Sequence, residues 1–280
     1  MPHFKLTLAY DGTSLVGWQR QAAGDSVQAL LEDSLAHLEE APVTVHGAGR
    51  TDAGVHALAQ VASVTLQRPV DARTVFRAVN ARLPECVRVL QVEDAPPSFH
   101  ARFSAAAKVY RYRLWNGWVL NPFDRAYAWH IPGPALDVDA MREAAGLLEG
   151  THDFQAFQGA GAQTHTSVRR LFSSRVTAEA DRAPSDRDLT LTAVLAQATF
   201  GREADPVPDG RLIVYDVCGD GFLRYMVRSI VGTLVEIGHG RMTPASMLEA
   251  LASRSRAAAG PTAPARGLFL ARVLYERPDL

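Results

Sequence analysis

The segment Gly49–Gly54 carries the most chemistry in the sequence, because it places an arginine and an aspartate between two glycines. Most stretches of the form Asp-x-Gly are surface turns in which the aspartate caps the residues that follow it. Here Arg50 and Asp52 are two residues apart, so an extended backbone puts both side chains on one face, where they can form a charge pair. Apolar residues such as Val55 follow, and the glycines let a planar ligand approach the backbone. We therefore predict a catalytic carboxylate at Asp52.

The elements before and after this segment must hold it in place, and they read as one α+β unit. Residues 4–10 alternate between apolar and polar types, which predicts a half-buried strand. Ser26 is typical of a helix N-cap, and Asp71 leads a second helix with Val75, Phe76 and Val79 on its inner side. Further strands are predicted at 43–45, 61–66 and 86–92. This strand–helix–strand–strand–helix–strand order favours a ferredoxin-like unit over residues 1–98.

The pattern begins again after the proline-containing segment 93–98, which we take as a linker. A second unit over residues 99–280 is predicted, with strands at 109–115, 212–217 and 268–274 and helices at about 141–148, 222–237 and after Thr243. Residues 178–208 are rich in turn-forming and charged types and predict a surface excursion. The expected fold is α+β, with two ferredoxin-like halves related by pseudo-twofold symmetry and a mostly antiparallel sheet.

Composition excludes several classes of protein. The 280 residues are 47% hydrophobic and 21% charged, which is typical of a soluble globular protein. We expect the two cysteines to be reduced and buried, and nine scattered histidines without a close pair to form no metal site. The sequence opens directly into a strand pattern, and no apolar run reaches the ~18 residues that a membrane span needs. We expect a cytoplasmic protein without a membrane segment.

Several blocks of sequence resemble the tRNA pseudouridine synthase A family. The segment Gly49–Ala57, with Gln60, resembles the signature of that family. The other blocks keep the family's order along nearly the whole chain and lie at 10–12 with 17–21, 80–84, 99–105 with 110–112, 221–232 and 263–268. A single short string is moderate evidence. Ordered blocks from residue 4 to about 275 make the probability of a chance similarity very small.

The resemblance implies that the chain converts uridine to pseudouridine within the anticodon arm of tRNA, at positions 38, 39 and 40 in the numbering of tRNA. Asp52 is then the catalytic residue, either as a nucleophile or by removing a ribose proton. Arg50 is implied to fill the space left by a flipped uridine, and Tyr110 to stack on the target base. Arg228 lies beside an apolar stripe, where an arginine needs an anion, and Asp52 is the expected partner. An isomerisation imports no group, so no cofactor is expected.

The implied partner surface is a positively charged RNA-binding cleft on the face of the sheet opposite the helices, completed across a homodimer. The net charge of −1 does not itself indicate a nucleic-acid partner. Whether the chain can bind RNA depends instead on whether its basic residues cluster on one surface. Lys5 and Lys108 are the only lysines, and abundant arginine also follows from a GC-rich genome. The candidate phosphate contacts are Arg20, Arg102, Lys108, Arg111, Arg169, Arg170 and Arg224.

Two other functions compete with the isomerase. One is a catalytically silent RNA-binding protein of the same fold, which would need no carboxylate beside phosphates. The other is a metal-dependent hydrolase that uses Asp52 with histidines, which a chelator would inactivate. The loop at 151–167, rich in glycine, is a candidate clamp on tRNA.

Overall fold

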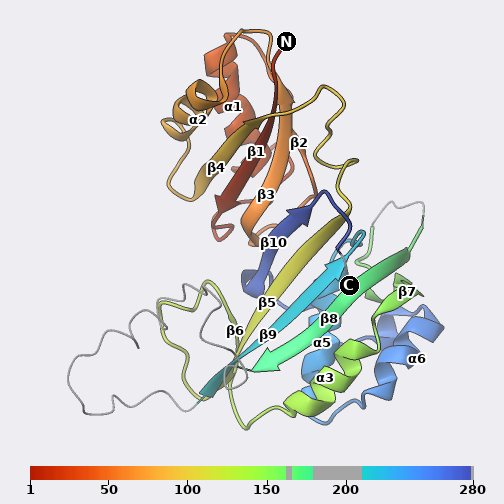
Figure 1. Ribbon diagram of the computed structural model, residues 1–280. Coiled ribbons are helices and arrows are strands. Elements are labelled where there is room, and N and C mark those ends of the chain that lie inside the picture. Colours follow the sequence, from red (N-terminus) through yellow and green to blue (C-terminus); the bar gives the residue numbers. More distant parts are fainter. Residues whose placement is uncertain (162–165, 179–209, 279–280) are drawn as a thin grey trace. The chain divides into compact units, whose positions relative to one another are not determined.

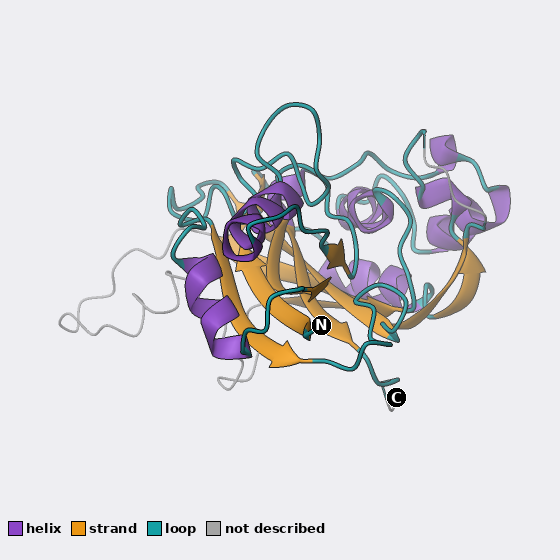
Figure 2. Cartoon of the chain, turned by 90° about the horizontal axis from the view of Figure 1, so that it is seen from above, coloured by secondary structure: helices purple, strands orange, loops and turns teal. Residues whose placement is uncertain are grey.

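The computed structural model describes residues 1–161, 166–178 and 210–278 (Figure 1). Within them the fold is α+β with a mostly antiparallel sheet, as predicted. Helices pack against strands, and turns and loops join them (Figure 2). The chain divides into two compact units. The first comprises Met1–Tyr110, Cys218–Gly221 and Phe269–Leu280, and the second comprises Arg111–Val217 and Phe222–Leu268. The excursion predicted at 178–208 lies outside the described residues, apart from Ala178.

The first unit follows the predicted order of elements, which are β1 (His3–Tyr10), α1 (Val27–Glu39), β2 (His46–Gly47), β3 (His56–Thr65), α2 (Ala72–Asn80) and β4 (Val87–Asp94). Strand β1 lies between β4 and β3 and is antiparallel to both, and β2 pairs antiparallel with β3. Strand β10 (Leu268–Leu274) adds to β3 in parallel through Phe269 and Leu270. Residues 1–94 thus form one antiparallel sheet with two helices.

The local sequence signals of these elements, their alternation and their helix caps, agree with the structure. Side chains of β1 alternate as predicted, with Phe4, Leu6 and Leu8 fully buried. Helix α1 begins where the Ser26 hydroxyl accepts a bond from Ala29 N, and α2 begins where Asp71 Oδ1 accepts one from Thr74 N at 2.7 Å. The two helices lie next to each other, and α2 packs on β4 (Figure 1).

Three details of the first unit differ from the prediction. Strand β3 begins at His56, five residues before the predicted strand, because residues 56–60 pair with Leu8, Tyr10 and β10. Residues 43–45 are not a strand, and the short β2 comes directly after them. Phe76 was expected on the inner side of its helix, but it is 36% exposed because only Val75 and Val79 of α2 are buried.

The second unit contains β5 (Ala107–Gly117), β6 (Trp129–Ile131), α3 (Val138–Gly146), β7 (Gly150–Asp153), β8 (Val168–Ala178), β9 (Gly210–Gly219), α5 (Met226–Gly238) and α6 (Ala245–Ser253), with the first four residues of β5 and the last two of β9 assigned to the first unit. Its strand order is β5-β9-β8-β7, with β6 beside β5. Short 3₁₀ turns lie at Gln155–Phe157, Arg256–Ala258 and Ala265–Gly267.

Helix α5 begins later and is buried more completely than predicted. The predicted start was about Phe222, but Tyr225 has a φ of 61°, a left-handed conformation that a helix cannot contain, and the helix starts at Met226. The sequence indicated one apolar stripe along it. In the structure Ser229, Gly232 and Thr233 are buried as well, so α5 is enclosed on nearly all sides.

Candidate active site

The Asp52 loop, residues 48–55, joins β2 to β3 and turns at Asp52. Val55 N donates to Asp52 O at 3.1 Å, which closes the turn. Asp52 is half-buried and Ala53 is exposed, while Val55 and Ala57 are buried. The apolar wall predicted after the carboxylate is present only in part, because Leu58, which was expected to belong to it, is 48% exposed. A half-buried carboxylate is open to a ligand on one side and poorly solvated on the other.

Residues 12–18 hold this loop from one side. Trp18 N donates to Thr51 O at 3.0 Å, and Gly54 N donates to Leu15 O at 3.3 Å. Gly17 has a φ of +104°, and a Cβ added there would lie 2.5 Å from Thr51 O and 3.0 Å from Asp52 C. No other residue type fits so close to the Asp52 backbone without strain. The two sequence blocks at 10–21 and 49–57 are thus two halves of one local structure.

Buried side chains hold the loop from the other side. The hydroxyls of Tyr10 and Thr51 are hydrogen-bonded at 2.8 Å, and Gln60 Nε2 donates to Gly49 O at 2.9 Å and to Tyr10 Oη at 3.4 Å. Burial raises the pKa of Tyr10 to about 12, although the bonds to Thr51 and Gln60 partly counter it. Tyr10 is therefore a neutral phenol at physiological pH, and it fixes the loop without adding charge.

Tyr110 belongs to the same cluster. Its side chain is 7% exposed, and its hydroxyl lies 4.0 Å from the position of a Cβ added at Gly49. Burial raises the pKa of Tyr110 well above its usual range, and the nearby Tyr10 and the negative charge of Asp52 raise it further. The structure thus brings Tyr110 within electrostatic reach of Asp52. The same glycine lies against Lys108, whose Cε is 3.3 Å from the added Cβ.

The arginine nearest in sequence to Asp52 behaves differently from the prediction. Arg50 is exposed, and among the described residues it forms no ion pair, so the expected Arg50–Asp52 charge pair is absent. Arg50 is exposed, whereas Asp52 is half-buried and begins the turn at residues 53 and 54. An exposed guanidinium at this position remains available to a nucleic acid.

His56 follows the loop and has a structural role. It is 1% exposed, stacks on Phe269 with ring centroids 4.7 Å apart, and its Nδ1 accepts a bond from Gly12 N at 3.0 Å. Because Nδ1 accepts that bond it carries no proton, so the approach of Asp11 Oδ1 at 3.2 Å is not an ion pair. No group of three or more His, Cys, Asp or Glu residues in the described ranges is arranged to hold a metal.

The predicted phosphate contacts fall into two groups. Two arginines are already paired with carboxylates, since Arg20 bonds to Glu32 and Asp33 at 2.8 and 2.7 Å and Arg111 forms a bidentate pair with Asp216. Others lie on aromatic rings or backbone oxygens. Arg102 lies 5.6 Å from the Phe103 centroid, Arg170 lies 5.4 Å from that of Phe172, and Arg169 donates to two backbone carbonyls. Within the described residues Arg102 and Arg169 form no ion pair, so these two are the better placed to receive phosphates.

In the second unit, Arg224 and Arg228 share one aromatic ring. Both guanidinium carbons lie over Tyr225, at 4.7 and 4.8 Å from its centroid. Arg228 is half-buried and donates from Nε to Ala263 O at 2.7 Å, whereas Arg224 is exposed. Tyr225 in its left-handed conformation therefore separates a fixed arginine from an exposed one.

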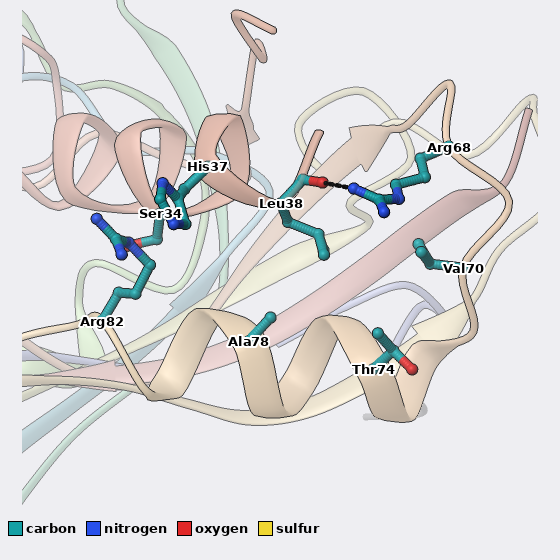
Figure 3. Close-up of a pocket in the computed structure, with 8 residues that line it drawn as sticks. All are labelled: Ser34, His37, Leu38, Arg68, Val70, Thr74, Ala78 and Arg82. Carbon is teal, nitrogen blue, oxygen red and sulfur yellow. Dashed lines mark hydrogen bonds between the residues drawn. The ribbon is translucent and has the colours of Figure 1, made fainter. Parts of the chain in front are cut away.

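A pocket of about 420 Å³ lies away from these residues, between α1 and α2 (Figure 3). It is lined by Ser34, His37, Leu38, Arg68, Val70, Thr74, Ala78 and Arg82. Arg68 donates to Leu38 O at 3.0 Å across its opening. None of the residues predicted for catalysis lines this pocket, so we place the candidate site at the Asp52 loop.

The sequence prediction missed the glycines that support the site. Gly12 and Gly17 belong to the sequence blocks at 10–12 and 17–21, but the sequence did not indicate a role for them at the site. A Cβ added at Gly12 would lie 2.1 Å from Val55 O. Only the fold shows which backbone each glycine faces.

This α+β chain, with its half-buried aspartate near two buried tyrosines, matches known proteins over most of its length. The family model described as tRNA pseudouridine synthase matches residues 7–104 and 144–276. Curated relatives named tRNA pseudouridine synthase A include one from Moorella thermoacetica, 42% identical over 277 residues that cover 98% of this chain and all of the relative. Another from Rhodospirillum centenum is 43% identical over 276 residues, with 98% of this chain and all of the relative covered.

The chain belongs to the tRNA pseudouridine synthase family, which is a family of isomerases. A relative from Solidesulfovibrio magneticus, also named tRNA pseudouridine synthase A, covers the whole chain at 42% identity and is itself covered to 93%. The resemblance seen in the sequence blocks is thus confirmed. In the described residues, no helix is long and apolar enough to cross a membrane.

Proposed function

We propose that this chain isomerises uridine to pseudouridine in the anticodon arm of tRNA, at positions 38, 39 and 40, with Asp52 as the catalytic nucleophile. The observation that carries this proposal is the position of Asp52. The loop that carries it is bonded to residues 15–18 on one side and to buried side chains on the other, and Asp52 itself lies within electrostatic reach of the buried Tyr110. A carboxylate held in this way meets a sugar carbon in a fixed geometry.

In the proposed reaction the Asp52 carboxylate attacks C1′ of the ribose, and an O–C1′ bond forms as the N1–C1′ bond breaks. The uracil leaves with the electron pair and turns within the site. A C5–C1′ bond then forms as the O–C1′ bond breaks, C5 loses its proton, and N1 gains one. Substrate and product are isomers, so the reaction needs no cofactor. If Asp52 instead removes a ribose proton, the same residue carries the step.

Three further residues have proposed roles around Asp52. Tyr110 stacks on the target base, and its raised pKa keeps the phenol neutral beside the carboxylate. Arg50 is exposed and occupies the place of the flipped uridine, where its guanidinium offsets part of the cost of flipping. Arg228 is proposed to keep Asp52 ionised and oriented, a role that its sequence block suggested.

The partner surface is proposed from the family resemblance. We propose a positively charged cleft opposite the helices, two halves at 1–98 and 99–280 related by a pseudo-twofold axis, and a homodimer that acts in the cytoplasm. Phosphates are received by Arg20, Arg102, Lys108, Arg111 and Arg224. Of these, Arg20 and Arg111 must first release carboxylates, so we expect the exposed Arg102 and Arg224 to contribute more.

The test is to incubate the protein with unmodified tRNA and to map pseudouridine chemically. Wild type should mark positions 38 to 40, and Asp52→Asn should bind tRNA while turnover falls by about a thousandfold or more. Asp139→Asn is the matched control, because Asp139 is 89% exposed on α3. Modification that survives in Asp52→Asn would refute the catalytic assignment. A wild type that binds tRNA but never converts it would show the silent RNA-binding protein instead.

A further inference from the structure

A ladder of three rings lies on the surface of the first unit. The rings of His46 and His100 are stacked with centroids 4.9 Å apart, and His100 and Phe103 follow at 4.4 Å. Phe103 ends the ladder and is 77% exposed. Arg102 lies over its ring at 5.6 Å. A single exposed phenylalanine is ordinary, but this ring ends a stack of aromatic rings and has an arginine over it.

The backbone holds the ladder rigidly. Ser104 N donates to His100 O at 2.9 Å, and His100 N donates to the Ser104 hydroxyl at 3.0 Å, which fixes the turn. Ala101 N donates to the Ser63 hydroxyl at 3.1 Å, and Ser63 is the strand partner of His46. Both ends of the His46–His100 stack are therefore anchored to one residue of β3. A rigid ring loses little conformational entropy when a ligand stacks on it.

The charge on the ladder suits a nucleic acid. His100 Nδ1 accepts bonds from Arg102 N at 3.1 Å and Phe103 N at 3.3 Å, so its proton is on Nε2. Burial lowers the pKa of His100, and the nearby His46 and Arg102 lower it further, so this ring is neutral at physiological pH. The positive charge comes instead from the exposed Arg102. Aromatic rings next to an arginine are a pattern typical of single-stranded nucleic-acid binding.

We propose that the His46–His100–Phe103 ladder, with Arg102, is a stacking platform for an unpaired nucleobase of the tRNA other than the uridine that reacts. Phe103 presents its exposed ring to the base, and Arg102 receives the adjacent phosphate. Asp52 lies six positions after His46, so an extended chain could place their Cα atoms at most ~20 Å apart. One RNA stem-loop can therefore engage both. A protein partner is less well suited, because the contacts of the ring among the described residues are with a histidine and an arginine.

The first experiment separates binding from catalysis. Phe103→Ala should raise KM for tRNA about tenfold and leave kcat unchanged, and Phe103→Trp should restore KM because any flat aromatic ring stacks. Phe76→Ala removes another exposed phenylalanine of the same unit, on α2, and should change neither constant. Melting temperatures measured alongside show that each variant is folded. An unchanged KM in a folded Phe103→Ala protein would overturn the proposal, as would a tryptophan that restores nothing.

The second experiment asks whether a base is what the ring binds. Wild type should bind a short single-stranded oligoribonucleotide more tightly than an abasic strand of equal length, and Phe103→Ala should lose most of that difference. A difference that persists in Phe103→Ala places base binding elsewhere. If Phe103→Ala changes the oligomeric state in sedimentation and leaves RNA binding intact, the ladder is a contact between copies of the chain, and the proposal is wrong.

Discussion

The Asp52 loop and the ring ladder belong to the same unit, but the chain holds their key residues in different ways. Asp52 is half-buried, and its backbone is bonded to Trp18 and Leu15 through its neighbours Thr51 and Gly54. Phe103 is mostly exposed, and its ring contacts only other rings and one arginine among the interactions of the described residues. One region fixes a side chain from several directions, and the other presents a flat surface.

This difference corresponds to two demands of an RNA-modifying enzyme. A nucleophile must meet one carbon atom in a narrow range of distance and angle, so its support has to be rigid and buried. Stacking tolerates rotation of the base and needs only an accessible ring. Substitutions that disturb the loop should therefore lower kcat, and substitutions in the ladder should raise KM. The predictions below test that division, from the largest expected effect to the smallest.

Gly17→Ala should cause the largest loss after Asp52→Asn. An alanine at a φ of +104° is strained, and its Cβ would approach Thr51 O to 2.5 Å. We expect the free energy of unfolding to fall by about 3 kcal/mol. The displaced Asp52 backbone should also lower kcat by more than a hundredfold, because catalysis depends on its position. Urea unfolding and single-turnover kinetics on tRNA measure the two effects.

Gly133→Ala is the control for this substitution. Gly133 has a φ of +116° but nothing within 4 Å of an added Cβ, so the variant contains the strain without the clash. It should lose about 1–2 kcal/mol of stability and retain its kcat. Equal kinetic losses in the two variants would show that contact with the Asp52 loop is unimportant.

Arg228→Met and Arg224→Met compare two cations on the same tyrosine ring. Arg228 is half-buried and bonded to Ala263 O, and we propose that it orients Asp52, so its loss should lower kcat about a hundredfold with near-normal folding. Arg224 is exposed and should contribute through phosphates, so its loss should raise KM and weaken the salt dependence of binding. A merely unfolded Arg228→Met protein would contradict the proposed role.

Much of the fold could be predicted because its signals are local. Ser26 and Asp71 cap helices through bonds to residues three positions on, and strand β10 was predicted with both ends correct. The predicted start of α5 was wrong because the true start depends on residues that are distant in the sequence. Gly159 donates to Arg224 O and has Tyr225 packed against it, with Cδ2 2.4 Å from an added Cβ. No pattern within 222–237 contains that constraint.

The candidate site shows the same limit. Asp52 and Tyr110 were selected by their types and motif spacing, and the structure places Tyr110 next to the loop. Gly12 and Gly17 had no predicted role, because their meaning lies in the backbone that they face. The expected Arg50–Asp52 pair is absent as well, because Arg50 is exposed to solvent while Asp52 is half-buried, a difference that their spacing does not reveal. Types of residue indicate chemistry, but contacts over long separations decide which of them meet.

Tyr10→Phe should give the smallest effect and the clearest dependence on pH. Removing the hydroxyl takes away the side-chain partner of the Thr51 hydroxyl and the longer of two bonds from Gln60 Nε2, and should cost about 1 kcal/mol of stability at pH 8, with a few-fold loss of kcat. The pKa of Tyr10 is about 12 in the folded chain, against the usual value near 10. Between pH 10 and 12 the unfolded chain therefore loses this proton while the folded chain keeps it, and the wild type becomes less stable as pH rises.

Phenylalanine cannot ionise, so the variant lacks this contribution. The stability difference between wild type and Tyr10→Phe should therefore shrink from pH 8 to pH 10 and reverse in sign by pH 11, where the wild-type penalty is about 1.4 kcal/mol. Other buried tyrosines affect both proteins equally and cancel in the difference. Urea titrations of both proteins at pH 8, 10 and 11 measure it. A difference that stays constant over this range would mean that Tyr10 is solvated. Tyr10 would then not be one of the buried side chains that hold the Asp52 loop rigid.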